Sequence, residues 1–350
     1  MSKILLLGEF SGLHTNLKEG LEEIGHHVVL VSSGDGEKNI KRDGDISVEE
    51  KNVLGKLKKY HKNNKYLKSL KNYDVVQFIN PYIMPRSTIF SYINIFNNNK
   101  KIVCLAAGTD IYLSEYIKKG GMSRYSPFDD ELKLPYDSLI HRTLQKKILK
   151  EMDLIIPSIY EYAEAYRQSD LGHKISETIP FPINTSKIEY VDNKITGKII
   201  IYHASNRPIV KGSNFIIEAM EIIEKKYPND VEIICAEYLP LDKYLETINK
   251  AHIIIDQCRS YSYAMNALYS MAKGKIVLSG SEPECNKELG IQNSPVINII
   301  PDVQQIVQQL EGILENKHKI EEMGIKSRSY VIENHNHISI AGKYVTTWKI

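Results

Sequence analysis

The sequence predicts an α/β protein built from two doubly wound parallel sheets. Short apolar runs recur along the 350 residues, with helical patterns between them. The runs are apolar throughout rather than alternating, which is typical of strands covered by helices on both faces. Strands separated by helices imply parallel βαβ units with right-handed crossovers. A hydrophobic content of 42% and a charged content of 25% exclude a disordered or collagen-like chain.

The expected strands fall into two sets. The first set lies at residues 4–7, 28–31, 75–79, 102–106 and 154–156, and the second at 199–203, 231–235, 253–256, 276–278 and 296–300. The boundary is expected at Pro180-Phe181-Pro182, because two prolines around one residue break a helix and favour an extended linker. We therefore predict an N-terminal domain over residues 1–185 and a C-terminal domain over 186–337. A short amphipathic helix is expected over 338–350.

Charge and cysteine content narrow the classes of function. Lysine and arginine number 45 against 43 acidic residues, and the net charge of +2 excludes a globally basic nucleic-acid binder. The cysteines lie far apart without a Cys-x-x-Cys pair, which indicates buried thiols in a reducing cytosol rather than disulfides or zinc ligands. The apolar run Ile4–Leu7 is too short for a signal peptide, and no run reaches the ~18 residues of a membrane span. A cytoplasmic location is expected.

One segment of the chain is strongly basic although the net charge of the whole sequence is close to zero. From Lys51 to Tyr73 the chain carries eight lysines and no acidic residue. One interpretation is a solvated helix face. The other is an amphipathic helix at an anionic membrane surface, with the segment Lys51–Lys71 facing the lipid headgroups. Its apolar side would consist of Leu57, Tyr60, Leu67 and Leu70.

Two strand-to-helix turns carry residues suited to binding anions. Gly8 and Gly12 after the first strand allow a tight turn at a helix N-terminus, but the pattern is not Gly-x-Gly-x-x-Gly and gives little support to a nicotinamide or flavin site. In the second set, Arg207 and Lys211 follow a strand and precede a helix that Ser213 would cap. Cations at that place suit a diphosphate, although two solvated basic residues on a loop would look the same.

The pieces resemble the family 4 retaining glycosyltransferases, which have the two-domain GT-B fold. Arg207 and Lys211-Gly212 match the family's strand, Arg and Lys-Gly opening a helix. The next match is a short helix before an apolar strand, and the last is the Ser11-Gly12 turn with its helix and strand. The residues of the short helix are Ala267-Leu268, Met271-Ala272 and Gly274-Lys275.

The resemblance implies a nucleotide-diphosphate sugar donor, UDP- or GDP-linked, and no cofactor or metal. Arg207 and Lys211 would hold the diphosphate, and the loop 261–266 would meet the donor sugar. The turn Ser11-Gly12-Leu13 would close over the diphosphate from the other domain, across a central cleft. The helix 338–350 would pack back on the N-terminal domain. Further donor-binding positions are Gly212, Tyr261, Tyr263, Asn266, Ala267 and Tyr269.

One departure from the family pattern concerns two glutamates separated by seven residues. Tyr261 and Tyr269 stand at the equivalent positions. Tyrosine can hydrogen-bond but carries no charge near neutral pH, so the donor contacts must differ or activity is weak or absent. Glu282 and Glu284 would supply a replacement carboxylate, unless they form an exposed acidic turn.

In the N-terminal domain two residues are candidates for the catalytic site. Asp110 follows the strand 102–106 and would face the reaction, or would cap the helix that starts at Ile111. His14 is the other candidate. The expected function is a glycosyltransferase of bacterial surface polysaccharide synthesis, acting on a glycan or lipid-linked acceptor, peripheral at the inner membrane face. The alternatives are a GT-B nucleotide-sugar epimerase and an inactive GT-B partner subunit.

Overall fold

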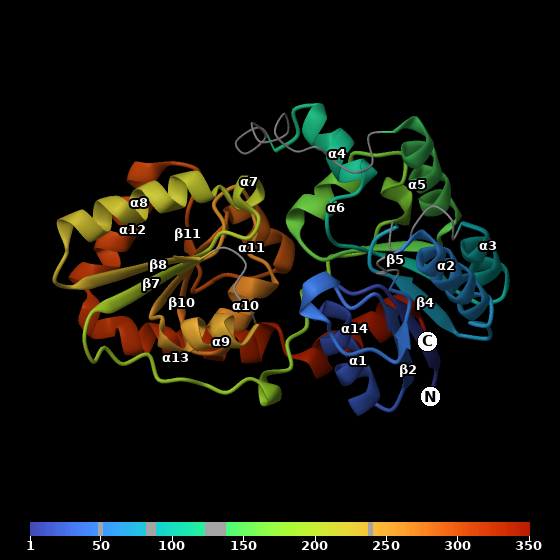
Figure 1. Cartoon of the computed structure of the whole chain (residues 1–350), viewed down its shortest axis with the longest axis horizontal. Helices are drawn as coiled ribbons and strands as arrows, with labels where there is room; N and C mark the ends of the chain where they lie inside the picture. Colours follow the sequence, from blue (N-terminus) through green and yellow to red (C-terminus); the bar gives the residue numbers. More distant parts are fainter. Residues whose placement is uncertain (48–51, 82–88, 123–137, 237–240) are drawn as a thin grey trace. The chain divides into compact units, whose positions relative to one another are not determined.

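The computed structural model describes residues 1–47, 52–81, 89–122, 138–236 and 241–350, which form two compact units (Figure 1). Of the described residues, the first unit comprises 1–119, 138–182 and 337–350. The second comprises 183–336 together with 120–122. Lys51, with which the basic segment begins, lies outside the described residues.

The first unit holds a six-stranded parallel sheet in the order β3-β2-β1-β4-β5-β6. The order in which successive strands are added to the sheet therefore reverses between β1 and β4, as in dinucleotide-binding folds. The strands are β1 (Lys3–Leu7), β2 (His27–Ser32), β3 (Gly44–Asp45), β4 (Val75–Phe78), β5 (Ile102–Ala106) and β6 (Leu154–Pro157). The two-residue β3 has no apolar run and was not predicted.

The second unit holds a five-stranded parallel sheet in the order β11-β10-β9-β7-β8. Its order reverses between β7 and β9, the flavodoxin-like arrangement. The strands are β7 (Ile199–Ala204), β8 (Val231–Ala236), β9 (Ile253–Ile255), β10 (Ile276–Ser279) and β11 (Ile297–Asn298). The prediction of two doubly wound parallel sheets is confirmed.

Helices cover both sheets. In the first unit they are α1 (Leu13–Glu23), α2 (Val53–Leu67), α3 (Ile89–Asn97), α4 (Ile111–Lys118), α5 (Leu139–Glu151), α6 (Tyr160–Arg167) and α14 (His337–Trp348). In the second they are α7 (Pro208–Lys211), α8 (Ser213–Lys226), α9 (Leu241–Lys250), α10 (Met265–Ala272), α11 (Pro283–Leu289), α12 (Val303–Glu315) and α13 (Ile320–Asn334). Short 3₁₀ turns lie at Gly36–Lys38, Gly172–Lys174, Thr185–Lys187 and Lys317–Lys319.

Each sheet has its own apolar core. In the first unit β1 is buried along Ile4–Leu7, and in the second all three residues of β9 are buried. Cys104, Cys258 and Cys285 are buried free thiols, whereas Cys235 is exposed because β8 is an edge strand. Among the described helices, none is long and apolar enough to cross a membrane.

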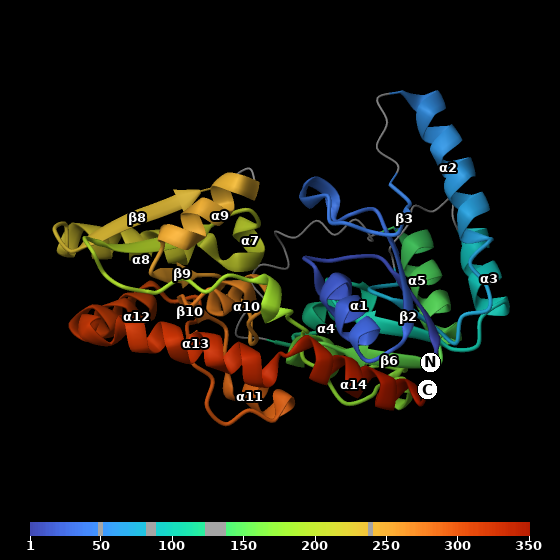
Figure 2. The same cartoon turned by 90° about the horizontal axis from the view of Figure 1, so that it is seen from below.

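The last helix, α14, packs against α1 within the first unit, and the two lie side by side in both views (Figure 2). Gly20 of α1 allows the approach, since an added Cβ would lie 2.2 Å from the carbonyl oxygen of His337. Tyr344 and Trp348 are buried, so the chain's end belongs to the core of this unit.

Candidate functional site

Residues 205–212, which follow β7, and residues 256–264, which follow β9, lie at the point where the strand order of the second sheet reverses. Loops at such a point diverge toward opposite faces, and open α/β sheets bind ligands there, beyond the carboxyl ends of the strands. Arg207, Lys211 and Tyr261 are all in these two loops. The described topology therefore places the predicted donor residues where a ligand is expected.

The loop after β7 carries two cationic residues, one at each end of a short helix. Arg207 precedes α7 and Lys211 ends it, four residues later, with the Lys211 amide donating to the Arg207 carbonyl at 3.0 Å. The Arg207 side chain is exposed and makes no hydrogen bond or ion pair within the described part of the chain. It is therefore available to an anionic ligand.

Gly212 sets the turn from α7 into α8. Its φ of +73° is left-handed, and an added Cβ would lie 2.5 Å from the sulfur of Cys258. Only glycine satisfies both conditions without strain. Gly212, rather than the predicted Ser213, precedes the first helical residue, and the Ser213 hydroxyl instead lies 2.8 Å from His203 Nε2.

His203 ties β7 to β9 and to α8. Its Nδ1 lies 2.8 Å from the carbonyl oxygen of Ile255, which can only accept, so Nδ1 carries the proton and Nε2 accepts from Ser213. Burial lowers the pKa of His203 to about 4. A neutral imidazole therefore fixes the base of the loop that carries Arg207.

Lys211 is not the free cation that the sequence suggested. Its ammonium donates to the Ala204 carbonyl and to Asp256 Oδ1, both at 3.0 Å, and its side chain is only 10% exposed. Asp256 follows β9 and also accepts from the Asn266 amide at 2.8 Å. The hydroxyl of Tyr244 donates to the oxygen of the same Asn266 side chain. A buried network thus joins both loops and the start of α10.

The loop after β9 separates the predicted tyrosines. Tyr263 is buried, and its hydroxyl lies 2.5 Å from that of Tyr330 and 3.2 Å from His335 Nε2, so it joins the loop to α13. Tyr261 is buried and its carbonyl accepts from the Glu282 amide at 2.9 Å. Tyr269 lies half-buried on α10, and Ala267 is fully buried.

The two replacement carboxylates lie at the start of α11. Glu282 is buried, and its Oε1 accepts from the Asn298 side-chain amide at 3.1 Å, so it is not part of an exposed acidic turn. Glu284 is half-buried in the first turn of α11. Among the described residues, the carboxylate that pairs with the Lys211 ammonium is Asp256.

In the turn after β1, the carboxylate of Glu9 occupies the place where an anionic ligand was expected. The carboxylate of Glu9 accepts from the His14 amide at 3.3 Å and from the Thr15 amide and hydroxyl at 2.8 and 2.7 Å. Burial raises the pKa of Glu9. The sequence analysis expected the amides at the start of α1 to bind an anionic ligand. In the structure the Glu9 side chain accepts from two of them, and the sequence analysis did not single out this residue.

The rest of this turn is held by β2 and its loop. Gly12, with a φ of +80°, precedes α1, and Leu13 is buried. The Ser11 amide donates to Asp35 Oδ2 at 2.8 Å, and the Ser11 hydroxyl accepts from the Lys38 ammonium at 2.7 Å. Of the predicted residues of this turn, only Ser11 is even partly exposed.

His14 does not face solvent. It is 0% exposed, and its Nδ1 and Nε2 lie 2.8 Å from the Gly8 carbonyl and 3.2 Å from the Gln77 amide nitrogen. Burial lowers its pKa to about 4. Both nitrogens are used within the fold, so this position does not match a substrate-facing imidazole.

Asp110 caps a helix. It is 0% exposed and precedes α4, with Oδ1 accepting from the Leu113 amide at 2.9 Å and Oδ2 from the Tyr166 hydroxyl at 2.6 Å. Burial raises the pKa of Asp110. Asp110 therefore caps α4, the second of the two expectations, and each of its carboxylate oxygens accepts a hydrogen bond within the first unit.

Sequence reasoning missed Asp256 and Asn80. Asp256 directly follows the apolar run of β9, a signal that could have found it. Asn80 follows β4, beside the reversal point of the first sheet, and its φ of +146° is strained for a residue other than glycine. Its side-chain amide donates to the Ala107 carbonyl at 3.0 Å, which joins the ends of β4 and β5.

Two cavities lie elsewhere in the second unit. Their volumes are about 340 and 520 Å³, and both are lined by residues near 193–197, at the amino-terminal edge of the sheet. None of the predicted site residues lines them. No group of three His, Cys, Asp or Glu side chains suited to a metal ion occurs among the described residues.

Neither a protein-family model nor a curated protein matches the sequence. Solved structures do match along its whole length. Sucrose-phosphate synthase from Thermosynechococcus elongatus is 14% identical with a TM-score of 0.64, over 99% of this chain and 98% of that one. HepE from Anabaena, in complex with UDP and glucose, is 12% identical with a TM-score of 0.65, over 100% of both chains. A Listeria monocytogenes chain assigned as a UDP-N-acetylglucosamine 2-epimerase is 12% identical with a TM-score of 0.55, over 99% and 95%.

These likenesses define the fold class. The chain has the two Rossmann-like α/β units of the GT-B glycosyltransferase structures. At identities of 12–14% they establish the fold alone, because one fold supports several activities.

Proposed function

We propose that the protein is a glycosyltransferase that takes its sugar from a UDP-linked donor. The observation that carries the proposal is Arg207, exposed and unpaired within the described residues, in the loop that follows β7 and four residues before Lys211. Guanidinium groups bind phosphate oxygens through two parallel hydrogen bonds, which suits a diphosphate. The whole-length likeness to HepE, solved with UDP and glucose, supports uridine as the nucleoside.

The proposed reaction retains stereochemistry and needs no metal. Arg207 and Lys211 would stabilise the negative charge that develops on the departing diphosphate, a role that metal ions fill in other enzymes. The residues of both loops after β7 and β9 would orient the donor. Sugar transfer to a glycan or lipid-linked acceptor of bacterial surface polysaccharide would be the biological use.

Replacing Arg207 by glutamine should lower the affinity for UDP about tenfold or more, because one charge-assisted bidentate contact contributes on the order of 1.5–3 kcal/mol. Calorimetric titration of UDP measures the change. Lys225→Gln, at the opposite end of α8, removes an exposed cation and should leave the affinity unchanged. Equal UDP affinity of wild type and Arg207→Gln would contradict the proposed site.

An epimerase is the second candidate, because a chain assigned as a UDP-N-acetylglucosamine 2-epimerase shares the fold. The two activities differ in what limits release of free nucleotide. A transferase should release UDP from a UDP-sugar in proportion to added acceptor. An epimerase should interconvert the donor sugar without an acceptor. Chromatography of the nucleotide products separates these outcomes.

We also propose that α2 brings the protein to an anionic membrane surface, where a lipid-linked acceptor would lie. Val53, Leu54 and Leu57 are 73%, 73% and 57% exposed, so the apolar side begins with three uncovered residues. Leu67 and Leu70, expected on that side, are buried in the core instead. The helix carries lysines at 56, 58, 59, 62 and 65, two more follow at 68 and 71, and no acidic residue occurs between 52 and 73.

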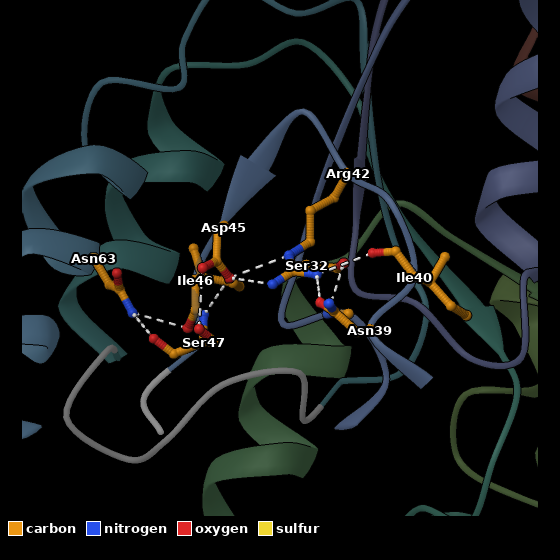
Figure 3. Close-up of polar contacts among 9 residues, drawn as sticks. Ser32, Asn39, Ile40, Arg42, Asp45, Ile46, Ser47 and Asn63 are labelled. Carbon is orange, nitrogen blue, oxygen red and sulfur yellow. Dashed lines mark hydrogen bonds and ion pairs between the residues drawn. The ribbon is translucent and has the colours of Figure 1, made fainter. Parts of the chain in front are cut away.

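The other end of α2 is fixed to the sheet. Asn63 is buried and donates to the carbonyls of Ile46 and Ser47 at 2.8 and 3.2 Å, just beyond β3 (Figure 3). Beside it, Arg42 donates to Asp45 Oδ1 through Nε and Nη2, at 3.1 and 3.0 Å. The helix is thus anchored by its second half, and the exposed apolar first half is left to meet a partner.

A quadruple variant tests the membrane proposal. Lys56, Lys58, Lys62 and Lys65 changed together to glutamine should weaken binding to vesicles containing anionic phospholipid at least tenfold, since each basic residue near the surface contributes about 1 kcal/mol. Co-sedimentation measures it. The matched control changes four lysines of the second unit, Lys225, Lys287, Lys319 and Lys326.

A second variant separates lipid from other polyanions. Leu54→Ser with Leu57→Ser should abolish the part of vesicle binding that survives high salt, because apolar side chains insert into the acyl boundary and are not screened. If the serine variant and wild type bind vesicles equally at every salt concentration, the two leucines do not contribute to binding, and docking by insertion is refuted.

A further inference from the structure

Asp256 places a negative charge inside the cationic part of the candidate site. Its side chain is 2% exposed and its Oδ1 lies 3.0 Å from the Lys211 ammonium. The ammonium has three donors, of which the Ala204 carbonyl and Asp256 take two. Lys211 is therefore both held and neutralised by the residue that directly follows β9.

The carboxylate is fixed independently of Lys211. Asn266, in the first turn of α10, donates to the same Oδ1 at 2.8 Å, and Tyr244 of α9 orients that amide by donating to its oxygen. Asp256 Oδ2 is buried without a hydrogen-bond partner in the described part of the chain. A buried carboxylate is costly unless a counter-charge compensates it, so Asp256 competes strongly for Lys211.

A ligand that uses Lys211 must displace this partner. Arg207 is the cation that a phosphate group can reach first, because it is exposed and unpaired within the described residues. A single phosphate group can bind the Arg207 guanidinium alone and leave the Lys211–Asp256 pair intact. A diphosphate has a second phosphoryl group, and Lys211 lies four residues after Arg207, at the end of the short α7.

We infer that Asp256 is a specificity-determining counter-ion, which holds Lys211 until a diphosphate replaces it and so favours nucleoside diphosphates over monophosphates. The inference rests on the proposed function, because it assumes that Arg207 and Lys211 form the phosphate site. It assigns to Asp256 a role opposite to that of a ligand-binding carboxylate. Loss of its charge should strengthen anion binding, not weaken it.

Asp256→Asn keeps the shape of the side chain and removes the charge. UDP should bind the variant on the order of tenfold more tightly, the size expected from one charge within a few ångströms of a partly buried site. UMP should gain more than UDP, because Lys211 becomes available without displacement. The ratio of UMP to UDP dissociation constants should therefore fall. Calorimetry with both nucleotides measures the ratio.

Two further variants keep the test decisive. Asp230→Asn removes a charge at the opposite edge of the sheet, where Asp230 pairs with Lys317, and should leave both affinities unchanged. Asp256→Asn combined with Lys211→Gln removes the buried pair together, so it reports on the site even if the single variant folds poorly. The double variant should lose the gain in UDP affinity and bind UDP more weakly than wild type.

The possible failures are distinguishable. Weaker UDP binding by Asp256→Asn, with wild type binding UDP and Arg207→Gln binding it poorly, would overturn the counter-ion role and leave the proposed function standing. An unchanged UMP to UDP ratio would also overturn it. Wild type that binds neither nucleotide would refute the proposed function itself.

Discussion

Gly280→Ala is expected to destabilise the second unit by about 3 kcal/mol, at the upper end for overpacking of a well-packed region. An added Cβ would lie 2.0 Å from the carbonyl oxygen of Ser260 and 3.2 Å from the amide nitrogen of Ser262. Both are backbone atoms, which cannot rotate away as a side chain can. Either the end of β10 or the loop after β9 must shift.

The shift should also reach the candidate site. The Gly280 amide donates to the Gln257 carbonyl at 3.0 Å, next to Asp256 in the chain. We therefore expect both a lower urea midpoint, followed by circular dichroism, and weaker UDP binding. Gly312→Ala is the matched control: no atom lies within 4 Å of an added Cβ there. Gly312 lies within α12, so alanine should stabilise the unit by about 0.5–1 kcal/mol. A Gly280→Ala protein as stable as wild type would contradict the close packing of this loop.

Apolar runs made the fold predictable, because a strand covered on both faces of its sheet needs apolar side chains at consecutive positions. Ile253–Ile255 is such a run, and it forms the fully buried β9. Once strands are placed, their carboxyl ends follow, and with them the positions of Arg207 and Lys211. The strand β3 has only two residues and no apolar run, so it could not be predicted.

The use of each polar side chain could not be predicted, because it depends on partners distant in sequence. Lys211 bonds to Asp256, 45 residues away, and His14 to Gln77, 63 residues away. A polar residue after a strand looks the same in the sequence whether it faces a ligand or serves the fold. Asp110 and His14 make hydrogen bonds within the first unit, whereas Arg207 has no partner among the described residues.

The tyrosines at the expected glutamate positions show the same limit. The tyrosines at positions 261 and 269 show that the expected glutamates are absent, but they do not indicate which other residue brings a carboxylate to the site. Asp256 comes from the strand end, not from the loop or the helix start that the resemblance pointed to. Its pairing with Lys211 is visible only when β9 and α7 are placed in space.

Acidification should destabilise the second unit through His203, with the loss running from about pH 6.5 down to about pH 4. The pKa of His203 is lowered to about 4 by burial, whereas an unfolded histidine titrates near 6.5. Between these values the unfolded chain binds a proton that the folded chain does not. Stability is therefore full above pH 6.5 and falls as the pH decreases, by up to about 3 kcal/mol.

Urea unfolding at pH values from 7.5 to 4.5 measures this effect, and His203→Asn isolates it. The variant cannot titrate at this position, so its stability should change over this range by about 2.5 kcal/mol less than that of wild type. The exposed His318, changed to glutamine, should leave the profile unaltered. His14 should act in the same direction in the first unit, where its pKa is also lowered to about 4.

The second unit gives the cleaner measurement, because two groups in the first unit act in the opposite direction. Burial raises the pKa of Glu9 and of Asp110, so each favours the folded state as the pH falls through its raised value. Their contributions offset part of the loss from His14. A His203→Asn profile parallel to that of wild type would show that the imidazole between β7, β9 and α8 has the same pKa in the folded and unfolded chain, and would contradict its burial as a neutral acceptor from Ser213.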